Sequence, residues 1–485
     1  MRARTKSCVS QLGDLPGLNT TTLENLSPAS KKSILAAASQ ICRQLMEDLG
    51  VKWKPQPVDS ALRARTISWI KTQVEPELGA PVNKRFLLSV DAGTTYTERV
   101  YEAGDFETKC SMVKYVSTAI YLDDLIDKDP NMAKEAECFL VTMLSSPDSS
   151  PFSSSRPGSP GSPGSPGSPG PGSHHDAFWL NQYRLVSLEL AAHMSDPFVS
   201  NMLLHSCTLY IEGCALEYRI QQDQSRYFLL QAADVELARD AAELELSDSW
   251  GSDITLPLDA DRIAGCESGG LVPHGWPIWL RERSAVAETF AITSFRAPHG
   301  VDIPTWLWVT AISELRTIIL SINDVLSFAK ELMADDTTSS IAVLTKERRM
   351  IGMPGTAPDG GWCLRDTFDE VLGKTLVTGA RINRLLRPSG TEARYAPDGR
   401  AYTVEELVKA LKREEGDDSD SEQSRWAKQE TMKALTLKLW ETHQRGYVAW
   451  HFQSERYRTR ELFDWVDGMM GPDAATGPEW IRSCF

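Results

Sequence analysis

The stretch that most constrains the fold covers residues 317–331, where a mainly apolar run is followed by polar residues at helical spacing. Asn323, Ser327 and Glu331 stand at i, i+4 and i+8, so a helix would align them in one stripe. Their amide, hydroxyl and carboxylate oxygens are hard donors that suit Mg²⁺. The polar face of an ordinary amphipathic helix is the alternative, but residues 317–320 indicate a largely buried helix, in which polar groups need partners or a metal. We therefore predict a metal site on this helix.

An acidic cluster ends a second predicted helix. Its apolar stripe leads into Asp123, Asp124 and Asp127, shortly before Pro130. Asp123 and Asp127 are one turn apart on the same face, and carboxylates this close repel one another unless a cation lies between them or some are protonated. A solvated helix end is the alternative, but negative charge at a helix C-terminus opposes the helix dipole. A bound metal would remove that conflict.

Helical periodicity recurs along the chain and no segment shows sustained strand alternation, so we predict an all-α fold. The segment 93–95 is expected to form a turn. The predicted helical segments are 33–49, 60–70, 86–90, 110–129, 178–219, 276–283 and 426–450, together with one that starts at Pro304 and carries Asn323, Ser327 and Glu331. We call these three residues the oxygen row.

A single domain over residues 31–470 is expected, with a flexible leader at 1–30 and a C-terminal tail at 471–485. Proline, glycine, serine and acidic residues are concentrated in several segments between the helices, which is typical of surface excursions. Disordered insertions are expected at about 148–176, with tandem Pro-Gly-Ser repeats, and at 232–275, 353–361 and 414–424.

The formal net charge of −15 argues against non-specific binding to nucleic acid or anionic membranes. The nine cysteines are scattered without a paired framework, which favours reduced thiols in a cytoplasmic protein over disulfides. No run of about 18 apolar residues occurs, so we expect no membrane-spanning helix.

Three motifs together carry a resemblance to a known family. They are the acidic cluster 123–127, the row Asn323-Asp324-x-x-Ser327-x-x-Lys330-Glu331, and a tail that begins Gly446-Tyr447-Val448-x-Trp450-His451 and continues to Arg456-Tyr457-Arg458. In order and separation they resemble the fungal trichodiene synthase family of class I terpene cyclases, over roughly residues 33–465. The sequence departs from the family at Glu282, where the family has the second arginine of a pair, and at Ser454, where it has an acidic residue.

The resemblance implies a single class I terpenoid synthase bundle of antiparallel helices around a central apolar cavity. It implies a sesquiterpene cyclase in which Mg²⁺, expected as three ions, binds farnesyl diphosphate and promotes release of pyrophosphate. The remaining allylic cation then cyclises. Such a cation must be kept from water, so the residues one turn before the motifs should form apolar walls: Val116, Ala119, Ile120, Ile319 and Leu320.

The resemblance also implies roles for individual residues. Asp123 would be the principal metal ligand, supported by Asp124 and Asp127, and Asn323, Ser327 and Glu331 would chelate metal on the opposite side. Asp123, Arg456 and Tyr457 are the expected catalytic residues. The residues expected to hold the diphosphate are Arg281, Lys330, Arg456 and Tyr457, with Arg283 as an alternative to Arg281.

Alternatives stay open at this point. A chain-elongating isoprenyl diphosphate synthase would use the same helices but would need a second aspartate-rich motif where this chain has Asn323-Asp324-x-x-Ser327. A non-catalytic helical scaffold would not need carboxylates and cations at three separate points. A small isoprenyl diphosphate is the expected partner, without nucleic acid or membrane, and a homodimer stays open. Trp306, Trp308, Phe328 and Trp450 are aromatic candidates for the cavity, although core packing is their commoner role.

Overall fold

A computed structural model describes residues 15–52, 57–140, 173–222, 276–283, 286–296, 301, 303–336, 338–389, 400–414 and 422–469. Within these ranges the regular structure is helical, apart from isolated β-bridge residues such as the pair Pro354 and Gly361. The predicted all-α fold is therefore confirmed. None of the helices described has the length and apolar character needed to cross a lipid bilayer.

In chain order, the bounds of the described helices are α1 Pro28–Asp48, α2 Ser60–Trp69, α3 Glu75–Leu78, α4 Lys84–Val100, α5 Phe106–Ile126, α6 Pro130–Ala136, α8 Ser173–Ala191, α9 Pro197–Gln222, α13 Trp276–Arg283, α14 Ala287–Thr293, α15 Ile312–Met333, α16 Ser340–Met350, α17 Leu364–Leu385, α18 Val404–Glu414, α19 Glu422–Gln453 and α20 Thr459–Met469. Short helical turns occupy Pro16–Asn19, Ile70–Val74, Thr305–Leu307 and Val309–Ala311.

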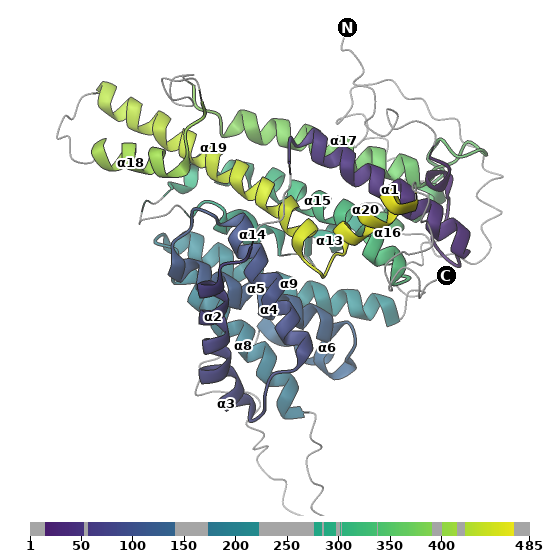
Figure 1. Ribbon diagram of the computed structural model, residues 1–485, viewed down its shortest axis with the longest axis horizontal. Helices are drawn as coiled ribbons and strands as arrows, with labels where there is room; N and C mark the ends of the chain where they lie inside the picture. The colour runs from purple at the N-terminus through teal and green to yellow at the C-terminus, as the bar shows by residue number, and fades with distance from the viewer. Residues whose placement is uncertain are drawn as a thin grey trace, which may run out of the picture.

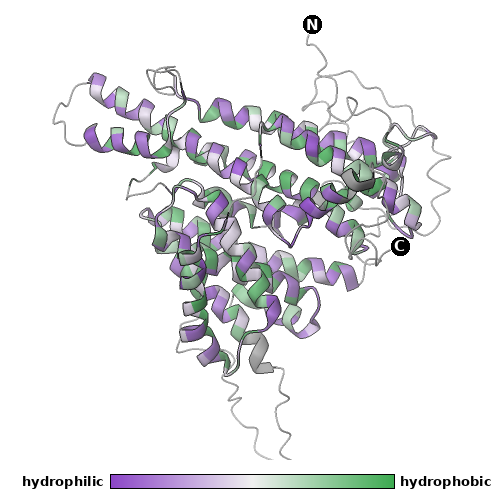
Figure 2. Cartoon of the chain, in the orientation of Figure 1, coloured by the Kyte–Doolittle hydropathy of each residue, from purple (hydrophilic) through white to green (hydrophobic). Residues whose placement is uncertain are grey.

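The helices form two groups that meet along α15 and α19 (Figure 1). One group contains α2 to α9, in which α5 packs against α4 and α8. The other contains α1 and α15 to α20, in which α15 packs against α17 and α1. Helix α19 packs against α4 and α15 and so joins the groups. Purple and green faces alternate along helices such as α1 and α17, as expected for amphipathic helices (Figure 2). One continuous apolar core runs from Leu18 to Val466.

The predicted turn at 93–95 is wrong, because these residues lie inside α4. Gly93 faces α5, where an added Cβ would lie 2.5 Å from the Ser117 hydroxyl oxygen. Thr94 and Thr95 donate their hydroxyl protons to the carbonyl oxygens of Val90 and Asp91, four residues earlier. Gly93 therefore lets α4 approach α5, and the two threonine hydroxyls bond within α4.

The predicted continuous helix over 178–219 is also wrong, because the chain forms α8 and α9 with a break before Pro197. A proline lacks a backbone N–H and is favoured at a helix start. The Asp196 carboxylate accepts a hydrogen bond from the backbone N–H of Phe198, which caps the new helix. The helix predicted to start at Pro304 also begins later than expected. Two short helical turns follow Pro304, and α15 begins at Ile312.

The predicted flexible leader at 1–30 is wrong for residues 15–30, which are docked on the helices, and residues 1–14 lie outside the described residues. Leu18 is fully buried in a short helical turn, and the Thr20 carbonyl oxygen accepts a hydrogen bond from the backbone N–H of Leu364. Helix α1 begins at Pro28, capped by Ser27. A few leucines are enough to dock this segment on the core, although its overall composition is polar.

The expected insertions have different outcomes. The loop 353–361 is not disordered, because its Thr356 N–H and the Cys363 N–H both donate to the Asp366 carboxylate, and Met353 and Trp362 are nearly buried. Residues 173–176 belong to α8, and 422–424 begin α19. The rest of the expected insertions lies outside the described residues, apart from Glu414, the last residue of α18, as does the tail 471–485.

A close helix crossing gives a stability test. Gly446 of α19 lies against the end of α4, where an added Cβ would lie 1.9 Å from the Arg99 carbonyl oxygen. We expect Gly446→Ala to cost about 2–3 kcal/mol and to lower the melting temperature, because one of the two backbones must shift. The control is Gly379→Ala on α17, where the new methyl meets only Ile318 Cδ1 at 3.4 Å and alanine is the better helix former. Equal melting temperatures for the two variants would contradict the tight crossing.

Candidate functional site

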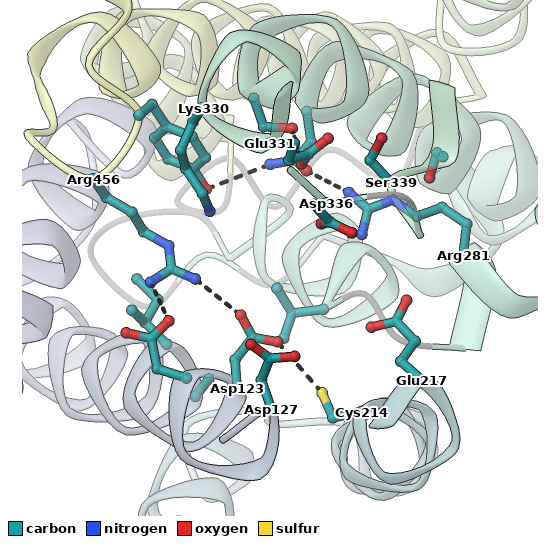
Figure 3. Close-up of a pocket in the computed structure, with 18 of the residues that line it drawn as sticks. Asp123, Asp127, Cys214, Glu217, Arg281, Lys330, Glu331, Asp336, Ser339 and Arg456 are labelled. Carbon is teal, nitrogen blue, oxygen red and sulfur yellow. Dashed lines mark hydrogen bonds and ion pairs between the residues drawn. The ribbon is translucent and has the colours of Figure 1, made fainter. Parts of the chain in front are cut away.

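The expected metal ligands, diphosphate-binding residues and apolar wall residues line one cavity of about 640 Å³ between the two helix groups. Helices α5 and α9 supply one wall, and α13, α14, α15 and α19 supply the others. Figure 3 shows Asp123 and Asp127 on one side, Lys330 and Glu331 on the opposite side, and Arg456 and Arg281 at the flanks. The predicted residues on this cavity are Val116, Ala119, Ile120, Asp123, Asp124, Asp127, Arg281, Ile319, Leu320, Asn323, Ser327, Lys330, Glu331, Arg456 and Tyr457.

The acidic side is held by arginines. Asp123 accepts a hydrogen bond of 2.9 Å from the Arg456 guanidinium, and the Cys214 thiol lies 3.7 Å from its other oxygen. Asp124 accepts from Arg456 at 3.1 Å and from Arg85 at 3.0 Å. Burial raises the pKa of Asp123, and Arg456 offsets part of that increase. Burial opposes ionisation of Asp124 too, but Arg456 and Arg85 outweigh it and lower its pKa.

The oxygen row lies on the facing side, as its spacing predicted. The Ser327 hydroxyl donates to the Glu331 carboxyl group at 2.5 Å. Burial raises the pKa of Glu331 to about 7, although Lys330 and the Ser327 hydrogen bond oppose the increase. The Asn323 amide oxygen accepts from Arg281, and its amide nitrogen lies 3.1 Å from Nε2 of His451.

The cationic residues come from separate parts of the chain. Arg281 of α13 binds Asp324 at 2.7 Å, whereas Arg283 lies 3.7 Å from Glu212, stacks on Trp279 and does not line the cavity. Of the two alternatives, the structure therefore brings Arg281 to the site. Lys330 lies over the Tyr457 ring, and burial, followed by the nearby Arg456, lowers its pKa.

Apolar and aromatic residues also line the cavity. Of the four aromatic candidates, only Trp450 lines the cavity. Trp306 is 56% exposed, Trp308 stacks on Phe295, and Phe328 packs edge-on against Phe368. Trp308 and Phe328 thus take the commoner role of core packing, and Trp306 neither lines the cavity nor is buried in the core.

The sequence reasoning missed most of the α9 wall. Tyr210, Cys214 and Glu217 line the cavity from this helix. Their positions i, i+4 and i+7 form one stripe, which was the available signal. The other cavity-lining residues that the sequence did not predict are Lys128, Tyr218, Gln221, Val286, Ala287, Phe290, Ala334, Asp335, Asp336, Thr338, Ser339, Ser340 and Tyr447.

The donor set can be compared with what Mg²⁺ needs. Among the residues that the structure describes, no three His, Cys, Asp or Glu side chains form a group that could hold a metal alone. Mg²⁺ usually keeps several waters and takes one or two carboxylates together with substrate phosphates. Asp123 and Asp127 on one side and Asn323, Ser327 and Glu331 on the other suit that mode. The residues thus fit Mg²⁺ that binds together with a phosphorylated ligand, and they do not form an all-protein cage.

The buried carboxyl group of Glu331 predicts a pH effect on stability. Its pKa is about 7 in the folded protein and ordinarily 4.5, so the folded state holds the proton more tightly. Stability therefore falls as pH rises from about 4.5 to about 7. We expect Glu331→Gln to melt at a higher temperature than wild type at pH 8 without Mg²⁺, and at the same temperature near pH 4.5. Glu314→Gln, at the start of the same helix, is the control in this thermal titration, and no gain at pH 8 would refute the prediction.

Comparison with models of known protein families gives no match, and comparison with curated proteins also gives none. Any assignment of function therefore depends on the site and on the motifs that form it.

Proposed function

We propose that this protein is a class I terpene cyclase that ionises farnesyl diphosphate, releases pyrophosphate and cyclises the allylic cation to a sesquiterpene. The observation that carries the proposal is the meeting of three groups at one cavity: the carboxylates of α5, the oxygen row of α15, and cationic side chains from three segments. They come from parts of the chain that are about 125 residues or more apart, except for Arg281 and the row. A scaffold protein would have no need to gather them.

The polar end of the cavity suits a diphosphate with divalent cations. Its carboxylates outnumber its cationic side chains, so a bare diphosphate would meet net repulsion. Mg²⁺ bound to Asp123 and to the row of Asn323, Ser327 and Glu331 would neutralise the charge that develops on the leaving diphosphate. The acidic side chains are Asp123, Asp124, Asp127, Glu217, Glu331, Asp335 and Asp336, and the basic ones are Lys128, Arg281, Lys330 and Arg456.

The protein's own cationic groups would bind and orient the diphosphate. Arg281, Lys330 and Arg456 donate hydrogen bonds without being able to accept them, and the Tyr457 hydroxyl can donate as well. Burial is the main reason that the pKa of Tyr457 rises to about 12, so the hydroxyl keeps its proton at neutral pH. In a buried site such donors stabilise developing negative charge more strongly than they would in water.

The apolar end suits an isoprenoid chain. Ile319 and Leu320 of α15, Val116 and Ala119 of α5 and Phe290 of α14 all line the cavity. A volume of about 640 Å³ is typical of small-molecule sites, which usually have 300–1,000 Å³. Walls without water-binding groups protect a carbocation from capture, and aromatic faces attract positive charge.

The test is incubation of the purified full-length protein with Mg²⁺ and farnesyl diphosphate, followed by mass spectrometry of volatile products. We expect a cyclic sesquiterpene and pyrophosphate. Parallel reactions with added isopentenyl diphosphate test for a chain-elongating prenyltransferase, which would yield a longer diphosphate instead. No product in either reaction, under conditions where pyrophosphate binding is also absent, would favour the non-catalytic scaffold and overturn the proposal.

A further inference from the structure

A buried histidine lies directly behind the oxygen row. His451 of α19 is 0% exposed and is not part of the cavity lining. Its Nε2 atom lies 3.1 Å from the amide nitrogen of Asn323, and its Nδ1 atom lies 2.8 Å from the Tyr447 carbonyl oxygen. The ring is held among the rings of Tyr447, Trp450 and Tyr457, with centroid distances of 4.8, 4.8 and 4.2 Å. His451 therefore has one fixed orientation.

The hydrogen-bond partners determine which atom donates in each contact. A guanidinium can only donate, so the Asn323 atom that faces Arg281 must be the amide oxygen. The other amide atom, which faces His451, is then the NH₂ group, and Nε2 of His451 must accept from it. Because the Tyr447 carbonyl can only accept, Nδ1 of His451 must carry the ring proton. This chain of contacts fixes both the histidine tautomer and the Asn323 amide.

We propose that His451 is a positioning residue that keeps the amide oxygen of Asn323 turned toward the cavity, where it can bind a metal ion. The inference rests on the proposed function in that it takes Asn323 as a Mg²⁺ ligand. An asparagine amide that is free to flip by 180° presents its NH₂ group, which cannot bind a cation. His451 opposes that second orientation, because a flip would place the amide oxygen against the lone pair of Nε2, and Arg281 opposes it as well, because its N–H would then face the NH₂ group.

The same helix offers a matched control. His443 lies two turns before His451, is also buried, and stacks between Trp440 and Tyr447. Among the residues that the structure describes, neither of its ring nitrogens has a hydrogen-bond partner. Replacing His443 removes a buried imidazole from the same aromatic surroundings without touching Asn323.

The experiment measures thermal stabilisation of the full-length protein by pyrophosphate as Mg²⁺ is titrated. We expect His451→Leu to raise the Mg²⁺ concentration for half-maximal stabilisation by about tenfold or more, the usual effect of losing a group that orients a metal ligand. His451→Gln should recover most of this loss, because its side-chain oxygen can accept from the Asn323 amide. His443→Leu should leave the Mg²⁺ requirement within about twofold of wild type, whatever its effect on the unliganded melting temperature.

Each outcome has a defined meaning. Equal Mg²⁺ requirements for His451→Leu and His443→Leu, with a normal wild-type response, would overturn the positioning role alone. Failure of the wild-type protein to respond to Mg²⁺ and pyrophosphate would contradict the proposed function, and the inference would fall with it. As a readout independent of any ligand, ¹⁵N NMR of labelled histidine should show the Nδ1–H tautomer for the signal that disappears in His451→Gln, and the Nε2–H tautomer would refute the assignment.

Discussion

Asn323→Ala should lower kcat with farnesyl diphosphate by on the order of 10³-fold, the scale of effect seen when one stabilising contact to developing charge is removed. The substitution removes the amide group of a cavity-lining residue and leaves Arg281 and His451 each without one partner. Steady-state kinetics across a range of Mg²⁺ concentrations measures the effect. High Mg²⁺ concentrations should recover only part of the rate, because the lost amide oxygen would fix the position of the metal ion as well as contribute to its affinity.

Ser321→Ala is the control for this substitution. Ser321 is a buried polar residue of the same helix, and its hydroxyl donates to the Thr317 carbonyl oxygen on another face of α15. Its replacement should change kcat by less than about twofold. If Asn323→Ala keeps full activity at low Mg²⁺, the oxygen row is not a metal site, and the helix-spacing argument for it fails.

Local sequence geometry was sufficient to predict the parts of the site that lie within one helix. The oxygen row of Asn323, Ser327 and Glu331 needs only the helical repeat to be aligned, and all three residues line the cavity. The same holds for Asp123 and Asp127, one turn apart on α5. A helix buried on most sides must bring its polar stripe to a cavity or a partner, so burial and spacing together identify the site helices.

Features that depend on two helices at once could not be predicted in this way. The sequence around Gly93 predicts a turn, because the contact that requires this glycine, with Ser117 of α5, does not appear in that sequence. The contribution of Cys214 and Glu217 depends on how α9 is rotated against α5, which the short-range pattern of α9 does not determine. Leu18 was assigned to a flexible leader because one leucine in a polar segment carries no periodicity.

The contacts of Arg456 with the carboxylates of α5 are another feature that the sequence around it does not reveal. From the sequence it would be a residue at the cavity rim with little effect on the unliganded protein. In the structure its guanidinium binds both Asp123 and Asp124, and its side chain is only 18% exposed. Without a ligand, Arg456 thus neutralises the acidic cluster, and it competes with any metal ion for Asp123.

Arg456→Ala should therefore have opposite effects on two ligand responses. We expect the unliganded melting temperature to fall by a few degrees, which corresponds to about 1–2 kcal/mol, because the carboxylates lose a partner but remain partly exposed. Mg²⁺ alone should then stabilise the variant more than wild type, because Asp123 is free to bind it. Mg²⁺ with pyrophosphate should add less than in wild type, because a cationic ligand of the diphosphate is lost.

The two responses can be separated by thermal shift with Arg85→Ala as the matched control. Arg85 also binds Asp124, at 3.0 Å, but it does not line the cavity. Arg85→Ala should therefore lower the unliganded melting temperature while keeping the additional stabilisation by pyrophosphate. A ligand that binds only the folded state adds RT ln(1 + [L]/Kd), about 2.7 kcal/mol at a hundredfold excess over Kd, so its loss is measurable. If Arg456→Ala keeps the full pyrophosphate increment and behaves like Arg85→Ala, then Arg456 only balances the charge of α5, and the diphosphate must be held by Arg281 and Lys330.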